Sequence, residues 1–157
     1  MIYWLYGQPG SGKTTLAKEL IYHLDNDLIG NQIRGPYKTI HIDGDGLREI
    51  FNNKDYSKEG REKNLRDVNK LIRFLDNQGF SVVVSVVAPY MDIRDEILDL
   101  NPIMIYLHTS EIRGKEDYFA DEFEIGGEDT HIDTTNKSIQ ETLNEILSIH
   151  RLSLIHI

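Results

Sequence analysis

The stretch that decides the fold is residues 1–20, MIYWLYGQPGSGKTTLAKEL. Its opening apolar run predicts a strand, and its last third favours a helix with leucines spaced four apart on one face. Between them lies the spacing G-x-x-x-x-G-K-[ST], filled by Gly7, Gly12, Lys13 and Thr14. A glycine turn between a strand and a helix is typical of a phosphate-binding loop, because backbone N–H groups there face an anion at the positive end of the helix. The chain is therefore expected to bind a nucleoside triphosphate.

Each part of this loop has an expected role toward ATP. Lys13 is expected to reach the β- and γ-phosphates, and the Thr14 hydroxyl to ligate Mg²⁺. A chance match in an ordinary glycine turn is the alternative, and the strand and helix that flank the motif argue against it. The residues expected to bind ATP here are Gly7, Gly10, Ser11, Gly12, Lys13, Thr14 and Thr15.

Strand and helix patterns alternate along the rest of the chain. Residues 80–88, FSVVVSVVA, are continuously apolar, which predicts a central strand covered on both faces. Ser57 is expected to cap a long helix that ends before Gly79, and the last helix is expected to face inward with Ile139, Leu143, Ile146 and Leu147. Further strands are predicted within 38–46, 103–109 and 130–135. The alternation predicts an α/β fold with a doubly wound, mainly parallel five-stranded sheet.

Length and charge limit the class of protein. With 157 residues the chain fits one domain, expected over 1–150, followed by an apolar tail over 151–157 that could pack on the sheet or join a partner, which leaves a homodimer open. Lys and Arg number 17 against 26 Asp and Glu, a net charge of −9, which argues against a broad nucleic-acid surface. The absence of cysteine excludes thiolate metal sites. No leader or membrane span is recognisable, so a cytoplasmic location is expected.

Two aspartates at a strand end favour phosphoryl transfer over other uses of ATP. Asp43 and Asp45 are expected on one side of an extended segment, where one holds a Mg²⁺-bound water and the other orients an acceptor hydroxyl. The simpler alternative is that both only cap the strand end and the following helix. Both roles are compatible, and the pair favours a kinase over a nucleotide-dependent switch.

An anionic acceptor would need local cations in so acidic a chain. Arg61 and Asn64, near the expected start of the long helix, and Arg48, earlier in the chain, supply such cations and donors. The alternative is that Arg61 and Asn64 are ordinary solvated residues of the first helix turn. Tyr56 precedes the same helix, where it could stack on a base or pack on its own helix.

The order of these motifs resembles the adenylyl sulfate kinase family. GQPGSGKT, DGDGLR, YSKEGREKN and APY follow one another as in that family, over roughly residues 1–100. The resemblance implies transfer of the ATP γ-phosphoryl group to the 3′-hydroxyl of adenylyl sulfate, with Mg²⁺ as cofactor and small-molecule nucleotides as partners. Lys13, Asp43 and Asp45 are then the catalytic residues, with Asp45 preferred as base and with Thr14 and Asp43 at the metal.

The same resemblance assigns the acceptor pocket. The positions matching the family's substrate contacts are Asp45, Arg48, Tyr56, Arg61, Asn64, Val87 and Ala88. Tyr56 takes the place of a base-stacking Phe. Arg113 and Lys115 are expected to cover the ATP phosphates from a divergent lid at about 110–128.

Several positions depart from the family pattern. Gly46 replaces an Asn, Ala88 a Ser, and Met91 a frequent Arg, and the lid is shorter. These departures suit a kinase for another nucleotide-linked acceptor, such as a cytidine diphosphoramidate kinase. A polynucleotide 5′-kinase is disfavoured by the acidic charge.

Overall fold

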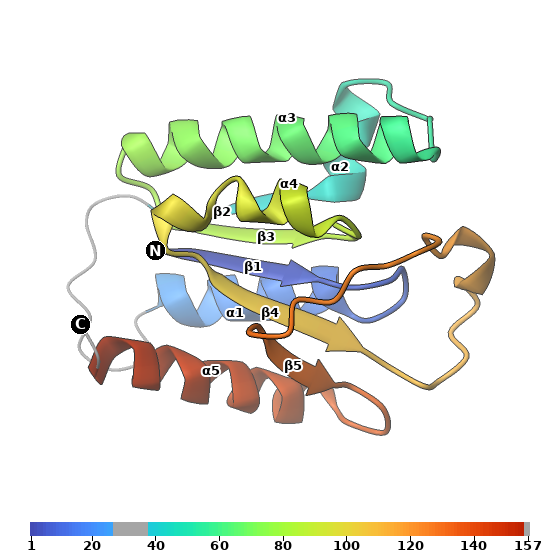
Figure 1. Ribbon diagram of the computed structural model, residues 1–157. Coiled ribbons are helices and arrows are strands. Elements are labelled where there is room, and N and C mark those ends of the chain that lie inside the picture. Colours follow the sequence, from blue (N-terminus) through green and yellow to red (C-terminus); the bar gives the residue numbers. More distant parts are fainter. Residues whose placement is uncertain (27–37, 156–157) are drawn as a thin grey trace.

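The computed structural model describes residues 1–26 and 38–155. Five parallel strands form one sheet in the order β2-β3-β1-β4-β5 (Figure 1). The strands are β1 (Ile2–Tyr6), β2 (Ile40–Asp43), β3 (Val82–Val86), β4 (Ile103–His108) and β5 (Thr130–Asp133). The prediction of a five-stranded parallel sheet is confirmed, with β1 and the apolar β3 at its centre.

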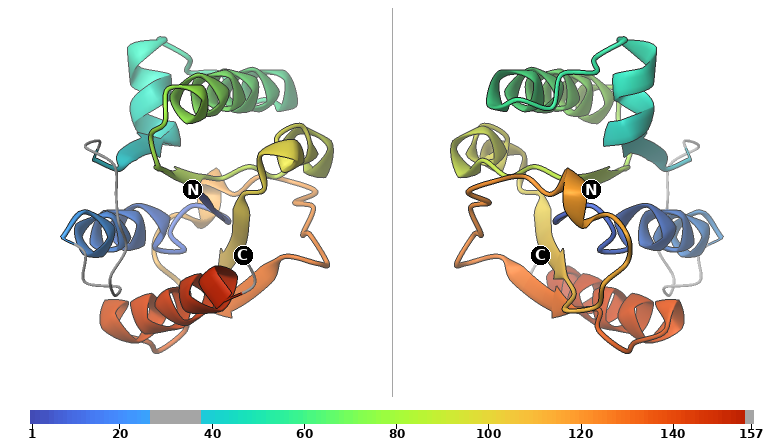
Figure 2. Two further views of the ribbon diagram at one scale, coloured as in Figure 1. Left: turned by 90° about the vertical axis from the view of Figure 1, so that its left-hand side faces the viewer. Right: turned by 90° about the vertical axis from the view of Figure 1, so that its right-hand side faces the viewer.

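Helices cover both faces of the sheet, so the fold is doubly wound as predicted. In Figure 2, α1 (Lys13–Asp25) and α5 (Ile139–Ile155) lie on one face, and α3 (Lys58–Asn77) and α4 (Met91–Asp95) on the other. The short helix α2 (Gly44–Ile50) follows β2 at its carboxyl end. Two single-turn 3-10 helices complete the set, η1 (Leu98–Leu100) and η2 (Glu116–Tyr118). None of the described helices is long and apolar enough to cross a bilayer.

Strand alternation explains how one sheet serves two cores. Trp4 and Val84 pack toward α3 and α4, whereas Tyr3, Leu5 and Val83 pack toward α1 and α5. Every residue of β1 and β3 is buried, which accounts for their apolar sequences, interrupted in β3 by Ser85. The leucines expected on the inner face of α1 are buried as well.

Two expected details at element ends are wrong. The first helix turn after β2 begins at Gly44, so Asp45 lies on a helix rather than on an extended segment. Ile139 is 48% exposed, because the first turn of α5 projects beyond the core that its later residues join. In addition, α5 continues to Ile155, so the predicted tail begins inside this helix, and residues 156 and 157 lie outside the described residues.

Candidate active site

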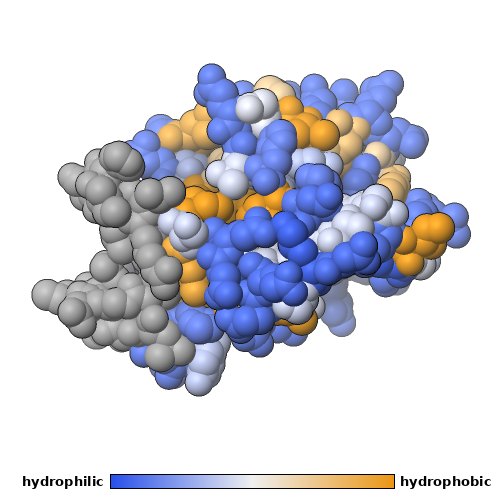
Figure 3. All heavy atoms as spheres, turned by 90° about the horizontal axis from the view of Figure 1, so that it is seen from below, coloured by the Kyte–Doolittle hydropathy of each residue, from blue (hydrophilic) through white to orange (hydrophobic). Residues whose placement is uncertain are grey.

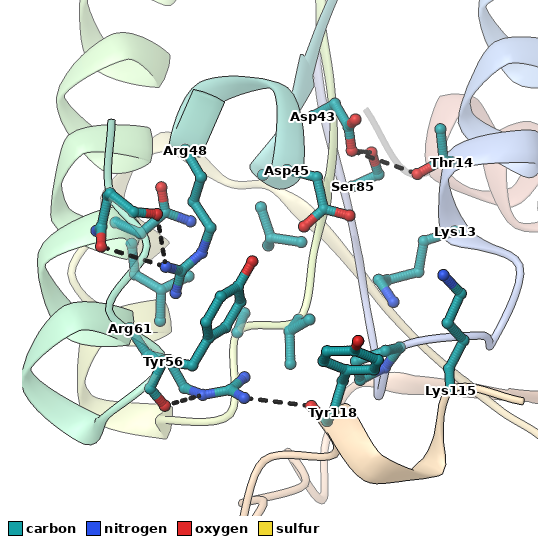
Figure 4. Close-up of a pocket in the computed structure, with 18 of the residues that line it drawn as sticks. Lys13, Thr14, Asp43, Asp45, Arg48, Tyr56, Arg61, Ser85, Lys115 and Tyr118 are labelled. Carbon is teal, nitrogen blue, oxygen red and sulfur yellow. Dashed lines mark hydrogen bonds between the residues drawn. The ribbon is translucent and has the colours of Figure 1, made fainter. Parts of the chain in front are cut away.

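The carboxyl ends of the central strands surround a pocket of about 860 Å³. This is the edge where parallel α/β sheets bind ligands, because the loops that leave the strands meet there. Figure 4 shows side chains from the phosphate loop, α2, α3 and the segment around η2 facing this space. Of the expected site residues, the pocket is lined by Gly10, Gly12, Lys13, Thr14, Thr15, Asp43, Asp45, Arg48, Tyr56, Arg61, Asn64, Val87 and Ala88.

The phosphate loop needs glycine at specific points. Gly10 and Gly12 adopt left-handed φ angles of 87° and 96°, which side chains other than glycine rarely accept. A Cβ at Gly7 would lie 2.2 Å from the Leu107 carbonyl oxygen. Gly7 therefore lets the loop pass the end of β4, although it does not line the pocket.

Lys13 is held inside the loop rather than extended into solvent. Its side-chain ammonium donates to the Gln8 carbonyl oxygen at 2.9 Å and to the Ser11 hydroxyl at 3.2 Å, and the residue is only 8% exposed. Burial lowers the pKa of Lys13 to about 8, although the charges of Asp45 and Asp43 raise it. An arriving phosphate would supply the negative charge that this buried cation lacks. Ser11, 2% exposed, contributes to the site through this contact.

Asp43 is turned toward the phosphate loop. It is the N-cap residue of α2, yet its carboxylate makes no capping hydrogen bond. Its Oδ1 instead accepts from the hydroxyls of Thr14 at 3.3 Å and Ser85 at 3.1 Å. The reading of Asp43 as only a cap is therefore wrong.

The Thr14 and Asp43 oxygens suit Mg²⁺. This ion prefers oxygen ligands and is typically held by one or two carboxylates together with substrate phosphates. A hydroxyl and a carboxylate side by side at the first turn of α1 provide that donor set. No cluster of three or more His, Cys, Asp or Glu side chains that could hold a metal ion occurs in the described part of the chain.

Asp45 stands apart from this pair and faces the open pocket (Figure 4). It lies in the first turn of α2 and accepts a hydrogen bond from none of the described residues. Its carboxylate is free to accept a proton or a hydroxyl hydrogen bond from a bound molecule.

Two arginines and one tyrosine build the opposite wall. The guanidinium of Arg48 lies 4.4 Å from the centre of the Tyr56 ring, and that of Arg61 lies 5.7 Å from it. Arg48 also donates to the Asp55 carbonyl oxygen at 2.9 Å, which orders the loop before α3. Both arginines are less than one-tenth exposed, so the alternative that Arg61 is a solvated first-turn residue is wrong. The Tyr56 ring is 55% exposed and lies between the two cations at the pocket wall.

Asn64 and the segment after β3 complete the acceptor side. The Asn64 side chain, 7% exposed, lines the pocket without a hydrogen-bond partner among the described residues. Ala88 has a left-handed φ of 46°, and its carbonyl oxygen accepts from Arg94 at 2.6 Å. This contact holds Val87 and Ala88 against the pocket.

The structure does not place Arg113 over the ATP phosphates. Its guanidinium donates to the carbonyl oxygens of Gly10 at 2.9 Å and Thr134 at 3.3 Å and pairs with Glu111 at 2.8 Å. These contacts join the Arg113 side chain to the phosphate loop and to Thr134, and Arg113 is not among the residues that line the pocket. Lys115, from the same segment, does line the pocket.

Sequence reasoning missed Ser85 and Tyr118. Ser85 is a polar residue inside the apolar run of β3, and it lines the pocket beside Asp43. The Tyr118 ring lies across the pocket from α3, and its carbonyl oxygen accepts from Arg61 at 3.2 Å. A serine at the carboxyl end of a buried strand was a usable signal; no local pattern singled out Tyr118.

A phosphate loop after β1 and a pocket with paired aspartates define a nucleotide-binding protein of the P-loop class. The profile of the family described as adenylylsulphate kinase matches residues 1–112. The chain therefore belongs to the adenylylsulphate kinase family, a family of P-loop phosphotransferases that act on a hydroxyl acceptor. The resemblance of the four motifs is confirmed.

Individual proteins that are similar to this chain include members of the same family. The chain is 35% identical to a cytidine diphosphoramidate kinase from Campylobacter jejuni over 95 residues, 60% of this chain and 51% of that protein. It is 28% identical to an adenylyl-sulfate kinase from Chloroflexus aurantiacus, over 99% of this chain and 91% of that protein. The Mycobacterium tuberculosis APS kinase in complex with AMPPNP and APS shares the fold, with a TM-score of 0.74, 19% identity and 96% of each chain covered. The match spans about half the length of the Campylobacter relative.

Proposed function

We propose that this protein is an ATP-dependent kinase that phosphorylates the 3′-hydroxyl of adenylyl sulfate. The observation that carries this proposal is one pocket with a phosphate loop on one side and a wall of Arg48, Tyr56 and Arg61 on the other. Asp45 lies between the two sides (Figure 4). A cationic aromatic wall suits a nucleotide with an anionic group, because a base can stack there beside the guanidinium charges.

The site residues divide the work of transfer. Lys13 and the loop N–H groups hold the β- and γ-phosphates, and Lys115 adds charge from the opposite segment. Thr14 and Asp43 would hold Mg²⁺, which when bound neutralises charge on the phosphates. Asp45 orients the acceptor hydroxyl and accepts its proton.

A second candidate is phosphorylation of a cytidine-linked acceptor. It is favoured by the relative from Campylobacter jejuni, by Gly46 and Ala88 at acceptor-side positions, and by the short segment that carries Lys115. The donor half of the pocket is the same for both acceptors. A switch without catalysis is disfavoured, because such a switch has no use for a free carboxylate such as Asp45 facing the pocket.

An acceptor screen separates these candidates. The purified protein is incubated with ATP, Mg²⁺ and adenylyl sulfate, cytidine diphosphoramidate, AMP or CMP in parallel, and products are identified by mass. We expect a product one phosphoryl group heavier from adenylyl sulfate, with ADP formed in equal amount. Product from the cytidine compound alone would select the second candidate, and ATP hydrolysis that no acceptor changes would reject both.

A further inference from the structure

We propose that Ser85 and His41 are positioning residues that fix the Asp43 carboxylate for the metal-bound nucleotide. This inference rests on the proposed function, since it concerns the Mg²⁺·ATP half of the same site. Neither residue belongs to the motifs that carry the family resemblance.

The sheet register brings the three side chains together. Asp43 and Ser85 are register partners on the neighbouring strands β2 and β3. His41 is two residues before Asp43, so its side chain points to the same face of the sheet. The Nε2 atom of His41 lies 2.7 Å from the Ser85 hydroxyl oxygen, which lies 3.1 Å from Oδ1 of Asp43.

The donors and acceptors on each group allow only one direction of donation along these hydrogen bonds, from His41 through Ser85 to Asp43. An ionised carboxylate only accepts, so the single hydroxyl proton of Ser85 is donated to Asp43. The Ser85 oxygen then accepts the proton on Nε2 of His41. His41 therefore sets the orientation of the Ser85 hydroxyl, and Ser85 sets that of the carboxylate.

The result is a carboxylate with one oxygen held and one left available. Oδ1 of Asp43 accepts from both Ser85 and Thr14. Oδ2 accepts from none of the described residues. Two hydroxyls on one oxygen stop the carboxylate from rotating and leave Oδ2 for a water bound to the metal. Hydrogen bonds of this kind behind a metal-binding group commonly contribute 10- to 100-fold to metal affinity or activity.

The burial of Ser85 argues that its hydroxyl group has a role, because burying a polar group costs free energy. Ser85 is 2% exposed within an otherwise apolar strand, where valine would add packing without a polar group to satisfy. His41 lies on the edge strand β2 and is half-buried, so it can be replaced with less disturbance of the core. Substitution of Ser85 therefore tests the inference at a buried position, and substitution of His41 tests it with less risk to the fold.

The test measures metal binding separately from turnover. Mn²⁺ replaces Mg²⁺, and its binding to the protein saturated with AMPPNP is followed by electron paramagnetic resonance. The variants are Ser85→Ala, His41→Leu, His41→Gln, which keeps an N–H donor, and Ser81→Ala, a serine outside β3 that does not line the pocket. AMPPNP affinity without metal and the fold, by circular dichroism, are measured for each.

We expect Ser85→Ala to weaken Mn²⁺ binding roughly tenfold or more, while its affinity for AMPPNP without metal stays near that of the parent. The Mn²⁺ affinity of the control Ser81→Ala should equal that of the parent. His41→Leu should weaken it several-fold and His41→Gln should restore most of the loss. Mn²⁺ binding within twofold of the parent in both Ser85→Ala and His41→Leu would overturn the inference, as would equal losses in His41→Leu and His41→Gln. If Ser85→Ala does not fold, the two His41 variants decide. Failure of the parent to bind Mn²⁺ with AMPPNP would instead reject the proposed function.

Discussion

At the residue scale, Lys13 makes nucleotide binding depend on pH. Its pKa of about 8 means that most of the free protein carries a neutral amine above that pH. Bound phosphate favours the charged form, so binding takes up a proton, and ATP affinity falls as the pH rises above about 8. Titration calorimetry in buffers of different ionisation enthalpy measures this uptake. Lys13→Met should abolish it, and uptake that persists in the variant would assign the proton to another group.

Turnover should respond to the same residue. Lys13→Ala removes the phosphate-loop cation expected to stabilise the charge of the transferred phosphoryl group, and we expect kcat to fall by about 100-fold or more while the fold is kept. Steady-state kinetics at saturating ATP measure the loss. Near-parental kcat in a folded Lys13→Ala protein would contradict the kinase proposal.

Asp45 and Arg61 should fail in different ways. Asp45→Asn keeps the shape but cannot accept the acceptor's proton, so kcat should fall with little change in ATP binding. Arg61→Ala removes a cation of the pocket wall and should mainly raise the acceptor KM. Both constants are measured with the acceptor selected by the screen. Normal kcat in Asp45→Asn would move the role of base to Asp43.

At the element scale, the segment after β4 is joined to the phosphate loop by side-chain hydrogen bonds. Gln8 donates to the carbonyl oxygen of Ala120 and accepts from its N–H group, each at 2.9 Å. Gln8→Leu removes both bonds at similar size, so the Ala120 amide should exchange roughly tenfold faster or more, as each bond contributes about 1 kcal/mol. Hydrogen exchange mass spectrometry of this segment measures the effect. Unchanged exchange would show that the two Gln8 hydrogen bonds do not hold this segment.

At the scale of the whole molecule, Arg94 joins parts that are distant in sequence. Its guanidinium donates to the carbonyl oxygens of Ala88 and Glu124, each at 2.6 Å, and lies 4.3 Å from the centre of the Tyr6 ring. The residue is 2% exposed. Removing it leaves the buried Ala88 carbonyl group and the partly buried Glu124 carbonyl group without these donors, so Arg94→Ala should lower the free energy of unfolding by about 3 kcal/mol.

The control for Arg94 is an exposed arginine. The Arg73 side chain is 47% exposed and pairs with Asp99 on the surface, where solvent screens such pairs and they contribute little to stability. Urea unfolding of Arg94→Ala and Arg73→Ala compares the two. Equal losses would refute a special role of Arg94 in joining the β3 end to the segment after β4.

Local patterns in the sequence predicted the strands, most helix faces and the phosphate loop. Apolar runs and four-residue spacing are visible within a few neighbouring residues. The glycines of the loop are required by the backbone conformation at their own positions. Ser57 could be identified as a cap because its partner, Gly60, is three residues away. Length and charge favoured one acidic domain, which stays a prediction.

Only the tertiary structure decided which cation faces the pocket and what holds Asp43. Arg113 and Lys115 are two residues apart in one segment, and carbonyl oxygens of Gly10 and Thr134 direct the first of them away from the pocket. Ser85 reaches Asp43 across 42 positions because β2 and β3 pair in that register. Such partners are chosen by the burial of whole strand faces and by unpaired backbone groups from distant segments, neither of which leaves a local pattern in the sequence.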